Sequence, residues 1–187
     1  MLSGCVGGDN EEQTTTLPPN DVSIDGIVTQ GEYDHMSVLS DGKFTMYWRF
    51  EENNIVIAMV AGTEGMISLG LDPGVGMKDS DMLIGWVDDG TFLYDCYSVD
   101  TTGPHPEDTE IGGTNDIIVY AGSEADGITT IELLRKLDTG DAYDKEIGTS
   151  GELQVIWAIS NSDSFSTKHS SRGGVKIELS SSDVSGY

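Results

Sequence analysis

Residues 65–86, GMISLGLDPGVGMKDSDMLIGW, place a glycine-rich loop between two short apolar segments. The flanking segments carry residues that suit strands, and the glycines and proline between them favour a turn. The pattern predicts a strand, a loop and a second strand. Asp89-Gly90 then predicts a tight hairpin to a third strand over 91–98, because this dipeptide suits a two-residue primed turn.

The same alternation of short apolar runs and turn residues continues along the chain. Phe44, Met46, Trp48 and Phe50 alternate with polar neighbours, which is the period of a half-buried strand. Further strands are expected at 22–28, 55–61, 116–121, 128–137, 153–159 and 175–179, and 32–36 as either a helical turn or an edge strand. We therefore expect one all-β domain over 22–187, an immunoglobulin-like antiparallel β-sandwich of about nine to eleven strands.

The composition limits the partners of this domain. The 187 residues include 33 acidic and nine basic side chains, so the net charge is -24. Such a surface repels nucleic acid and anionic lipid headgroups, and no stretch approaches the roughly 20 apolar residues of a membrane span. We expect no nucleic-acid partner.

The first 21 residues have a different character. Residues 6–21 combine Gly, Thr, Pro and acidic residues with few large apolar side chains, which predicts a disordered tether. Before them, Leu2-Ser3-Gly4-Cys5 resembles the lipobox of prokaryotic lipoproteins, in which the cysteine carries the lipid. This resemblance implies a lipid anchor on Cys5 and an extracytoplasmic, cell-surface location, and the alternative is a chance cysteine in a disordered tail. Cys96 lies in a predicted strand and suits a small buried side chain.

Met77 stands in the polar loop between Gly76 and Lys78. A thioether favours burial, so this methionine either folds back over the edge of the sandwich or meets a soft metal. Met66, at the start of the preceding strand, is a rival sulfur.

The chain has three histidines. His35 is expected on the surface. His105, between two prolines in GPHPED, is expected as a solvated loop residue, with presentation to a metal or a partner as the alternative. His169 lies in the loop that follows the Trp157 strand.

Two segments resemble one family. Residues 70–86 are similar to the signature of the DOMON family of extracytoplasmic β-sandwich domains, in which a small-residue turn, a methionine, an Asp or Asn and an apolar strand follow in order. The second segment has Trp157-Ala158-Ile159-Ser160-Asn161, then Ser164-Phe165-Ser166, then His169, and resembles the haem-b-binding type found in the cytochrome domain of cellobiose dehydrogenase. The resemblance implies haem b held between Met77 and His169. It departs at Met66, where family members often have Trp.

Basic residues near these two positions add an independent argument. Lys78 adjoins Met77, and Lys168 and Arg172 lie close to His169 in sequence. Haem propionates are best compensated by charged hydrogen bonds from Lys or Arg, so we expect these three residues near the propionates. The alternative is that polar loops simply carry charge.

The expected function is that of an extracytoplasmic b-type cytochrome domain. No C-x-x-C-H motif is present, so the haem would be noncovalent. Two axial ligands would leave no open position on the iron, so the expected chemistry is electron transfer. The redox partner protein is unidentified. No G-x-S-x-G elbow or metalloprotease helix occurs, and we expect a domain that is not an enzyme.

Two weaker hypotheses remain from the sequence. The domain is alternatively a haem-free carbohydrate-binding module, with Tyr97, Tyr120 or Tyr143 stacked on sugar rings. The acidic loop 138–144 is a candidate calcium site, although it lacks EF-hand spacing.

Overall fold

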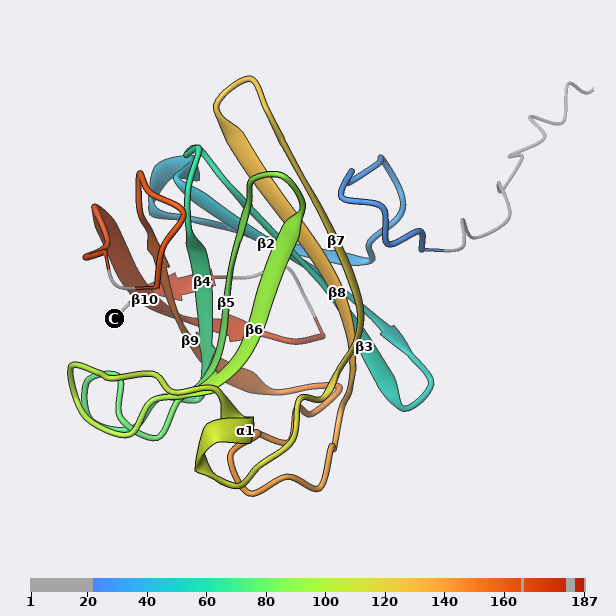
Figure 1. The fold of residues 1–187 in the computed structure, drawn as a ribbon. Coiled ribbons are helices and arrows are strands. Elements are labelled where there is room, and N and C mark those ends of the chain that lie inside the picture. Colours follow the sequence, from blue (N-terminus) through green and yellow to red (C-terminus); the bar gives the residue numbers. More distant parts are fainter. Residues whose placement is uncertain (1–21, 166, 181–183, 187) are drawn as a thin grey trace, which may run out of the picture.

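A computed structural model describes residues 22–165, 167–180 and 184–186 and has two antiparallel sheets packed face to face (Figure 1). The five-stranded sheet has the order β1 (His35–Leu39), β2 (Phe44–Glu51), β3 (Asn54–Ala61), β8 (Ile128–Lys136) and β7 (Ile117–Ala125). The six-stranded sheet has the order β11 (Val184–Gly186), β10 (Ser171–Glu178), β9 (Glu152–Ile159), β4 (Ile67–Leu71), β5 (Asp81–Val87) and β6 (Thr91–Tyr97). Only a 3-10 turn, Ser40–Gly42, and the single-turn helix α1, Asp108–Ile111, are helical among the described residues. The expectation of an all-β sandwich is confirmed.

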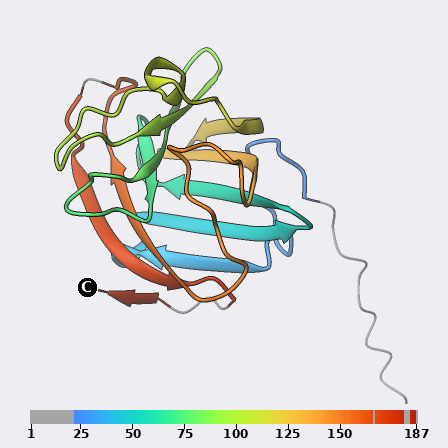
Figure 2. The same ribbon diagram turned by 90° about the horizontal axis from the view of Figure 1, so that it is seen from below.

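The hydrophobic core lies between the two sheets. In β2, alternate side chains Phe44, Met46 and Trp48 are fully buried, as the period-two pattern predicted. Across the core, the Phe44 ring lies 5.6 Å from that of Trp157 in β9. The buried indole of Trp48 donates to the carbonyl of Leu179 at 2.9 Å, so its polar group is satisfied. Figure 2 shows the five-stranded sheet from below, from blue β1 to yellow β7.

The hairpin predicted at Asp89-Gly90 is confirmed. Strands β5 and β6 pair antiparallel, with Val87 opposite Thr91 at the turn and Ile84 opposite Tyr94 farther down. This register places β6 beside β5 at one edge of the six-stranded sheet.

The strand expected at 22–28 is wrong. This segment is irregular because its backbone N–H groups bond to side chains instead of a neighbouring strand: those of Asp25 and Gly26 donate to Glu132 Oε2 at 3.1 and 2.7 Å. Gly26 has φ +86°, a conformation that strands do not use. Glu132 alternates in β8 with core residues, so the segment crosses the outer face of the five-stranded sheet.

His35 is not a free surface residue as expected. It begins the edge strand β1, is half-buried, and stacks on Trp48 with ring centroids 5.3 Å apart. The alternative of an edge strand near 32–36 is thus closer to the structure than a helical turn.

Candidate functional site

The loop between β4 and β5, residues 72–80, carries Met77 and rests on residues 98–107. The N–H of Met77 donates to the Thr101 carbonyl at 3.1 Å, and that of Asp79 donates to the Ser98 carbonyl at 2.8 Å. Gly76 has φ +68°, and a Cβ there would lie 2.7 Å from the Thr101 oxygen, so only glycine allows this approach. The two loops project side by side at the lower left of Figure 1. Met77 is half-buried within this pair of loops, and Lys78 is exposed.

The outer face of the six-stranded sheet is apolar beside these loops. Four buried side chains form a cluster separate from the core: Met66, Met82, Ile84 and Cys96. Trp86, Tyr94 and Ile156 pack against it. An outer sheet face is polar when it meets water, so this cluster, the outer-face cluster below, indicates that the face is covered. Cys96 is free and buried, as expected, whereas the cluster as a whole was not predicted from the sequence.

Gly70 permits close packing on this outer face. Gly70 lies between the core residues Leu69 and Leu71 of β4 and therefore faces outward. A Cβ on Gly70 would come within 2.5 Å of both the Met82 sulfur and the Ser80 hydroxyl oxygen. Neighbouring side chains already fill the space over Gly70, so only glycine fits at this position.

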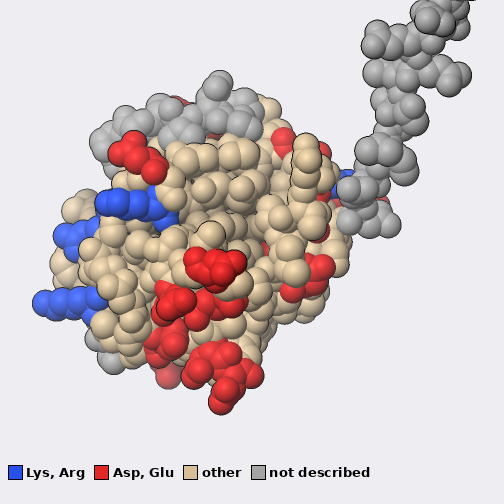
Figure 3. Space-filling view, turned by 90° about the horizontal axis from the view of Figure 1, so that it is seen from above, with Lys and Arg blue, Asp and Glu red and all other residues tan. Residues whose placement is uncertain are grey.

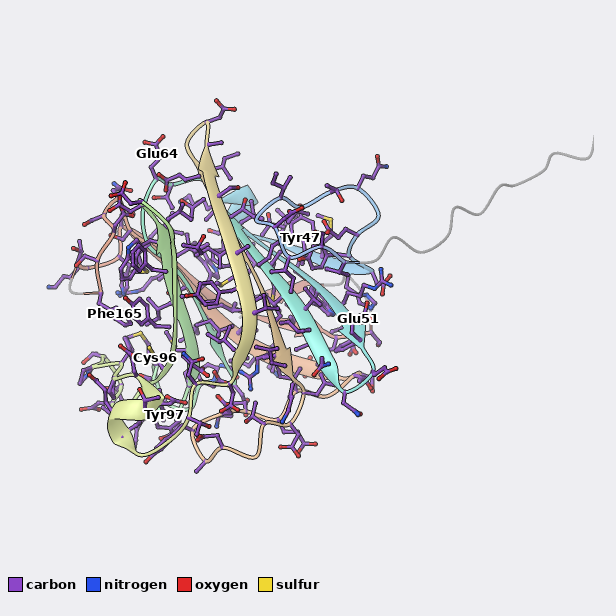
Figure 4. The ribbon with its side chains drawn as sticks, turned by 45° about the vertical axis from the view of Figure 1, so that its right-hand side comes forward. Tyr47, Glu51, Glu64, Cys96, Tyr97 and Phe165 are labelled. Atoms are coloured by element: carbon purple, nitrogen blue, oxygen red, sulfur yellow. The ribbon has the colours of Figure 1, made fainter. Side chains whose placement is uncertain are left out.

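The loop between β9 and β10 folds onto the same face. The ring of Phe165 meets Tyr94 and Trp86 edge-on, at centroid distances of 4.8 and 5.9 Å. Figure 4 shows Phe165 and Cys96 on the same side of the sandwich. This loop carries His169, which is half-buried, and Lys168, which is exposed.

His169 lies next to one of the predicted basic residues. Its Nε2 is 3.4 Å from Nη1 of Arg172, an exposed side chain at the start of β10. A guanidinium only donates, so a hydrogen bond here would use the lone pair of Nε2, which is also the lone pair by which imidazole binds metals.

His105 lies in the segment 98–107, on which the Met77 loop rests. It is half-buried instead of solvated, and its Nδ1 is buried without a hydrogen-bond partner. Burial lowers the pKa of His105, and the charge of His169 lowers it further.

These residues fit a haem. The outer-face cluster is apolar, and the β4–β5 and β9–β10 loops carry a thioether and an imidazole, which are ligand types that haem iron takes. Met77 and His169 would hold the iron, and Lys78, Lys168 and Arg172 are available to propionates at the exposed rim.

The tyrosines proposed for a sugar platform do not form one. Tyr97 and Tyr143 are half-buried and meet each other edge-on at 5.2 Å. The Tyr97 hydroxyl donates to Asp79 Oδ1 at 3.1 Å, and the Tyr143 hydroxyl donates to the Ile111 carbonyl at 2.8 Å. Only Tyr120, on β7, keeps an exposed face.

A buried ionic cluster lies behind the β4–β5 loop. Arg135 of β8 donates from Nη1 to Asp81 Oδ2 at 2.7 Å and places Nη2 3.5 Å from Asp144 Oδ2. Burial alone would lower the pKa of Arg135, but the charges of Asp81 and Asp144 raise it. Asp95 of β6 completes the group, since one oxygen of each of the three carboxylates lies within 4.8 Å of the others. Of the acidic loop 138–144, only Asp144 joins this group.

Charge and surface shape mark other regions of the molecule. On the face seen from above, acidic side chains form a central band, while basic ones gather at the left (Figure 3). A cavity of about 390 Å³ is lined by 28–31, 33–36 and Tyr47, over the other sheet, and one of about 220 Å³ lies by Trp157 and Gly173. Neither cavity includes Met77 or His169. Cys5 lies outside the described residues, which contain no helix with the length and apolar character of a membrane span.

The fold defines an all-β sandwich domain. Residues 40–160 match the DOMON domain family, and the chain belongs to that family.

Curated relatives are much longer than the matched segment. The chain is 31% identical over 126 residues to MOXD1 homolog 2 of Drosophila melanogaster, which covers 67% of this chain and 16% of the relative. It is 26% identical over 132 residues to DBH-like monooxygenase protein 1 of Gallus gallus, covering 70% of this chain and 21% of the relative. The chain thus spans only about a fifth or less of these proteins.

Among solved structures, the cytochrome b domain of pyranose dehydrogenase from Coprinopsis cinerea has a similar fold. The TM-score is 0.54 at 18% identity, over 73% of this chain and 76% of that domain. At this identity the likeness establishes the fold.

Proposed function

We propose that this DOMON domain is a b-type cytochrome domain that binds one noncovalent haem over the outer-face cluster. Met77 and His169 would be the axial ligands, and Lys78, Lys168 and Arg172 would meet the propionates. The observation that carries the proposal is the apolar outer face, where Met66, Met82 and Ile84 cluster and onto which the loop with Phe165 and His169 folds. The fold shared with a cytochrome b domain supports it.

The proposed chemistry is electron transfer. When bound, haem supplies a one-electron couple, and ligands on both sides of the iron leave no open coordination position. Two contacts anchor the loops. The N–H of Met77 bonds to the Thr101 carbonyl, and Phe165 of the His169 loop packs on Tyr94. A rigid arrangement keeps the ligands in place while the charge of the iron changes.

The proposed setting is extracytoplasmic, with a redox partner protein as donor or acceptor. The lipobox-like Cys5 supports a lipid anchor at the cell surface. One relative is named as a monooxygenase protein, and the structural neighbour is a domain of a dehydrogenase, so partners from oxidoreductase chemistry are favoured.

Reconstitution tests this proposal. Purified protein is mixed with haemin, and the absorption spectrum is recorded before and after dithionite. We expect sharp low-spin bands at one haem per chain. A protein that retains no haem after desalting overturns the proposal, and a sugar array would then test the carbohydrate-binding alternative.

A further inference from the structure

The buried ionic cluster has more negative than positive charge. Asp81, Asp95 and Asp108 are 0%, 3% and 1% exposed, and the Asp144 side chain is 1% exposed. Arg135 is the single basic side chain that pairs with them among the described residues. Four carboxyl groups against one guanidinium require further compensation, either by protons or by a cation.

The geometry leaves one side of these carboxylates open. Asp81 Oδ2 accepts from Arg135 Nη1 at 2.7 Å and from the Lys145 N–H at 2.9 Å, whereas its Oδ1 is buried with no partner. Asp95 Oδ2 accepts from the Asp116 N–H at 2.8 Å, and its Oδ1 is also buried with no partner. In Asp81 and Asp95, Oδ2 is held by hydrogen bonds that fix the side chain, and Oδ1 remains available to bind a ligand.

Asp108 is an independent observation that points to a ligand. It lies in α1, outside the three-carboxylate group, and both of its oxygens are buried with no partner. The antiparallel bridge between Cys96 and Glu107 sets Asp108 beside Asp95. Burial raises the pKa of Asp108 to about 8, and the charges of Asp95 and Asp144 contribute. Buried, unpartnered polar atoms of this kind are rare in native proteins.

We propose that Asp81, Asp95, Asp144 and Asp108 bind a hard divalent cation, of which Ca²⁺ is the best match. The donors are oxygens without any His or Cys, which hard cations prefer. Ca²⁺ accepts six to eight oxygens in flexible geometry, so carboxylates from two strands and two loops can be joined by backbone carbonyls and water. Mg²⁺ requires a stricter octahedron and keeps more of its water.

The position of this site gives it a role. Asp81 begins β5 directly after the β4–β5 loop, Asp95 lies in β6, and Asp108 and Asp144 come from the loops that follow β6 and β8. A cation would tie these segments together behind the loop that carries Met77. It would stabilise the fold whether or not haem is bound, so the site stands independently of the cytochrome proposal.

Calorimetry on the full chain tests the proposal. EDTA-treated, haem-free protein is titrated with CaCl₂ and, separately, MgCl₂ in 0.15 M KCl at pH 7.5, and thermal unfolding is followed with and without each ion. We expect one Ca²⁺ per chain and a midpoint several degrees higher, with a weaker response to Mg²⁺. The conservative variants Asp95→Asn and Asp108→Asn should each lower Ca²⁺ affinity at least tenfold.

A matched control separates this site from the acidic surface. Asp89→Asn removes one carboxylate at the exposed turn beyond the other end of β5 and should leave Ca²⁺ binding unchanged. The proposal is overturned if the wild type gives neither binding heat nor a midpoint shift, because the cluster then holds protons instead of a cation. It is equally overturned if Asp95→Asn and Asp108→Asn both bind Ca²⁺ as the wild type does. Haem reconstitution in EDTA is scored separately and decides the cytochrome proposal alone.

Discussion

Phe165 meets Tyr94 edge-on, with ring centroids 4.8 Å apart and planes at 72°. Phe165 belongs to the β9–β10 loop and Tyr94 to β6, so this contact fastens the loop that carries His169 to the outer face of the sheet. The distance between the proposed ligands therefore depends on aromatic packing as well as on strand pairing.

Phe165→Ala should weaken haem binding with little loss of fold stability. An edge-on aromatic contact contributes about 0.5–1.5 kcal/mol, so we expect a roughly two- to tenfold loss of haem affinity in a spectroscopic titration. Phe92→Ala is the matched control, since Phe92 is equally exposed at 39% and stacks on Trp86, but from the β5–β6 hairpin. Equal losses in both variants would mean that Phe165 does not position the histidine loop.

The two proposed ligands should fail in different ways. His169→Ala removes the imidazole and should release the haem or leave it high-spin. Met77→His should keep a low-spin haem at a lower potential, because two nitrogen donors stabilise the ferric ion relative to a nitrogen and a thioether. Absorption spectra and redox titration measure both effects.

Met66 and His105 supply the controls for the ligand test. Met66→Ala should keep low-spin bands because Met66 belongs to the floor. His105→Ala should also keep them, although the charge of His169 lowers the pKa of His105. If Met66→Ala gives high-spin haem and Met77→Ala stays low-spin, the sulfur ligand is Met66 and the assignment of Met77 is wrong.

The basic residues should matter for retention of haem. Replacing Lys78, Lys168 and Arg172 together by Gln should speed haem transfer to apomyoglobin, with each exposed charge pair contributing about 0–1 kcal/mol. All three side chains are exposed, so the effect should shrink as salt is added. Lys43→Gln/Lys136→Gln removes exposed charges outside the proposed ligand loops and should leave the transfer rate unchanged.

Arg135 should be among the most sensitive residues for stability. Removing one partner of a buried ion pair leaves the other charge uncompensated, so Arg135→Met should lower the free energy of unfolding by about 3–5 kcal/mol. Urea unfolding measures this, and the neighbouring exposed Lys136→Met is the control. A loss below about 1 kcal/mol would show that Asp81 and Asp144 are neutral in the folded protein.

The strands were predictable where the pattern is local. Period-two alternation fixes β2, and Asp89-Gly90 fixes the β5–β6 hairpin. The segment 22–28 was not predictable in this way, since Glu132, more than 100 residues away in sequence, captures the backbone donors that a strand would pair.

The site was predictable only in part for a related reason. Met77 and His169 follow from a motif, whereas the contact between Phe165 and Tyr94 depends on how a loop folds back across a sheet. The ionic cluster draws Asp81, Asp95 and Asp144 from three separated segments, and nothing in the sequence of any one segment marks them as neighbours.

The stability of the cation-free protein should fall as pH rises from about 4 to about 8. Burial, reinforced by nearby carboxylates, raises the pKa of Asp95 from 3.8 to about 7 and that of Asp108 to about 8. Between the unfolded pKa of 3.8 and the raised pKa of each group, the folded protein holds more protons than the unfolded chain. Each step up in pH over this range therefore favours unfolding. Thermal midpoints in EDTA at pH 5, 6, 7 and 8 should therefore decrease, and Asp95→Asn/Asp108→Asn should flatten the trend.

Ca²⁺ competes with these protons, so the midpoint difference between Ca²⁺ and EDTA should grow over the same range. A midpoint in EDTA that rises from pH 5 to 8 would mean that the two carboxyls are ionised throughout and already compensated within the protein.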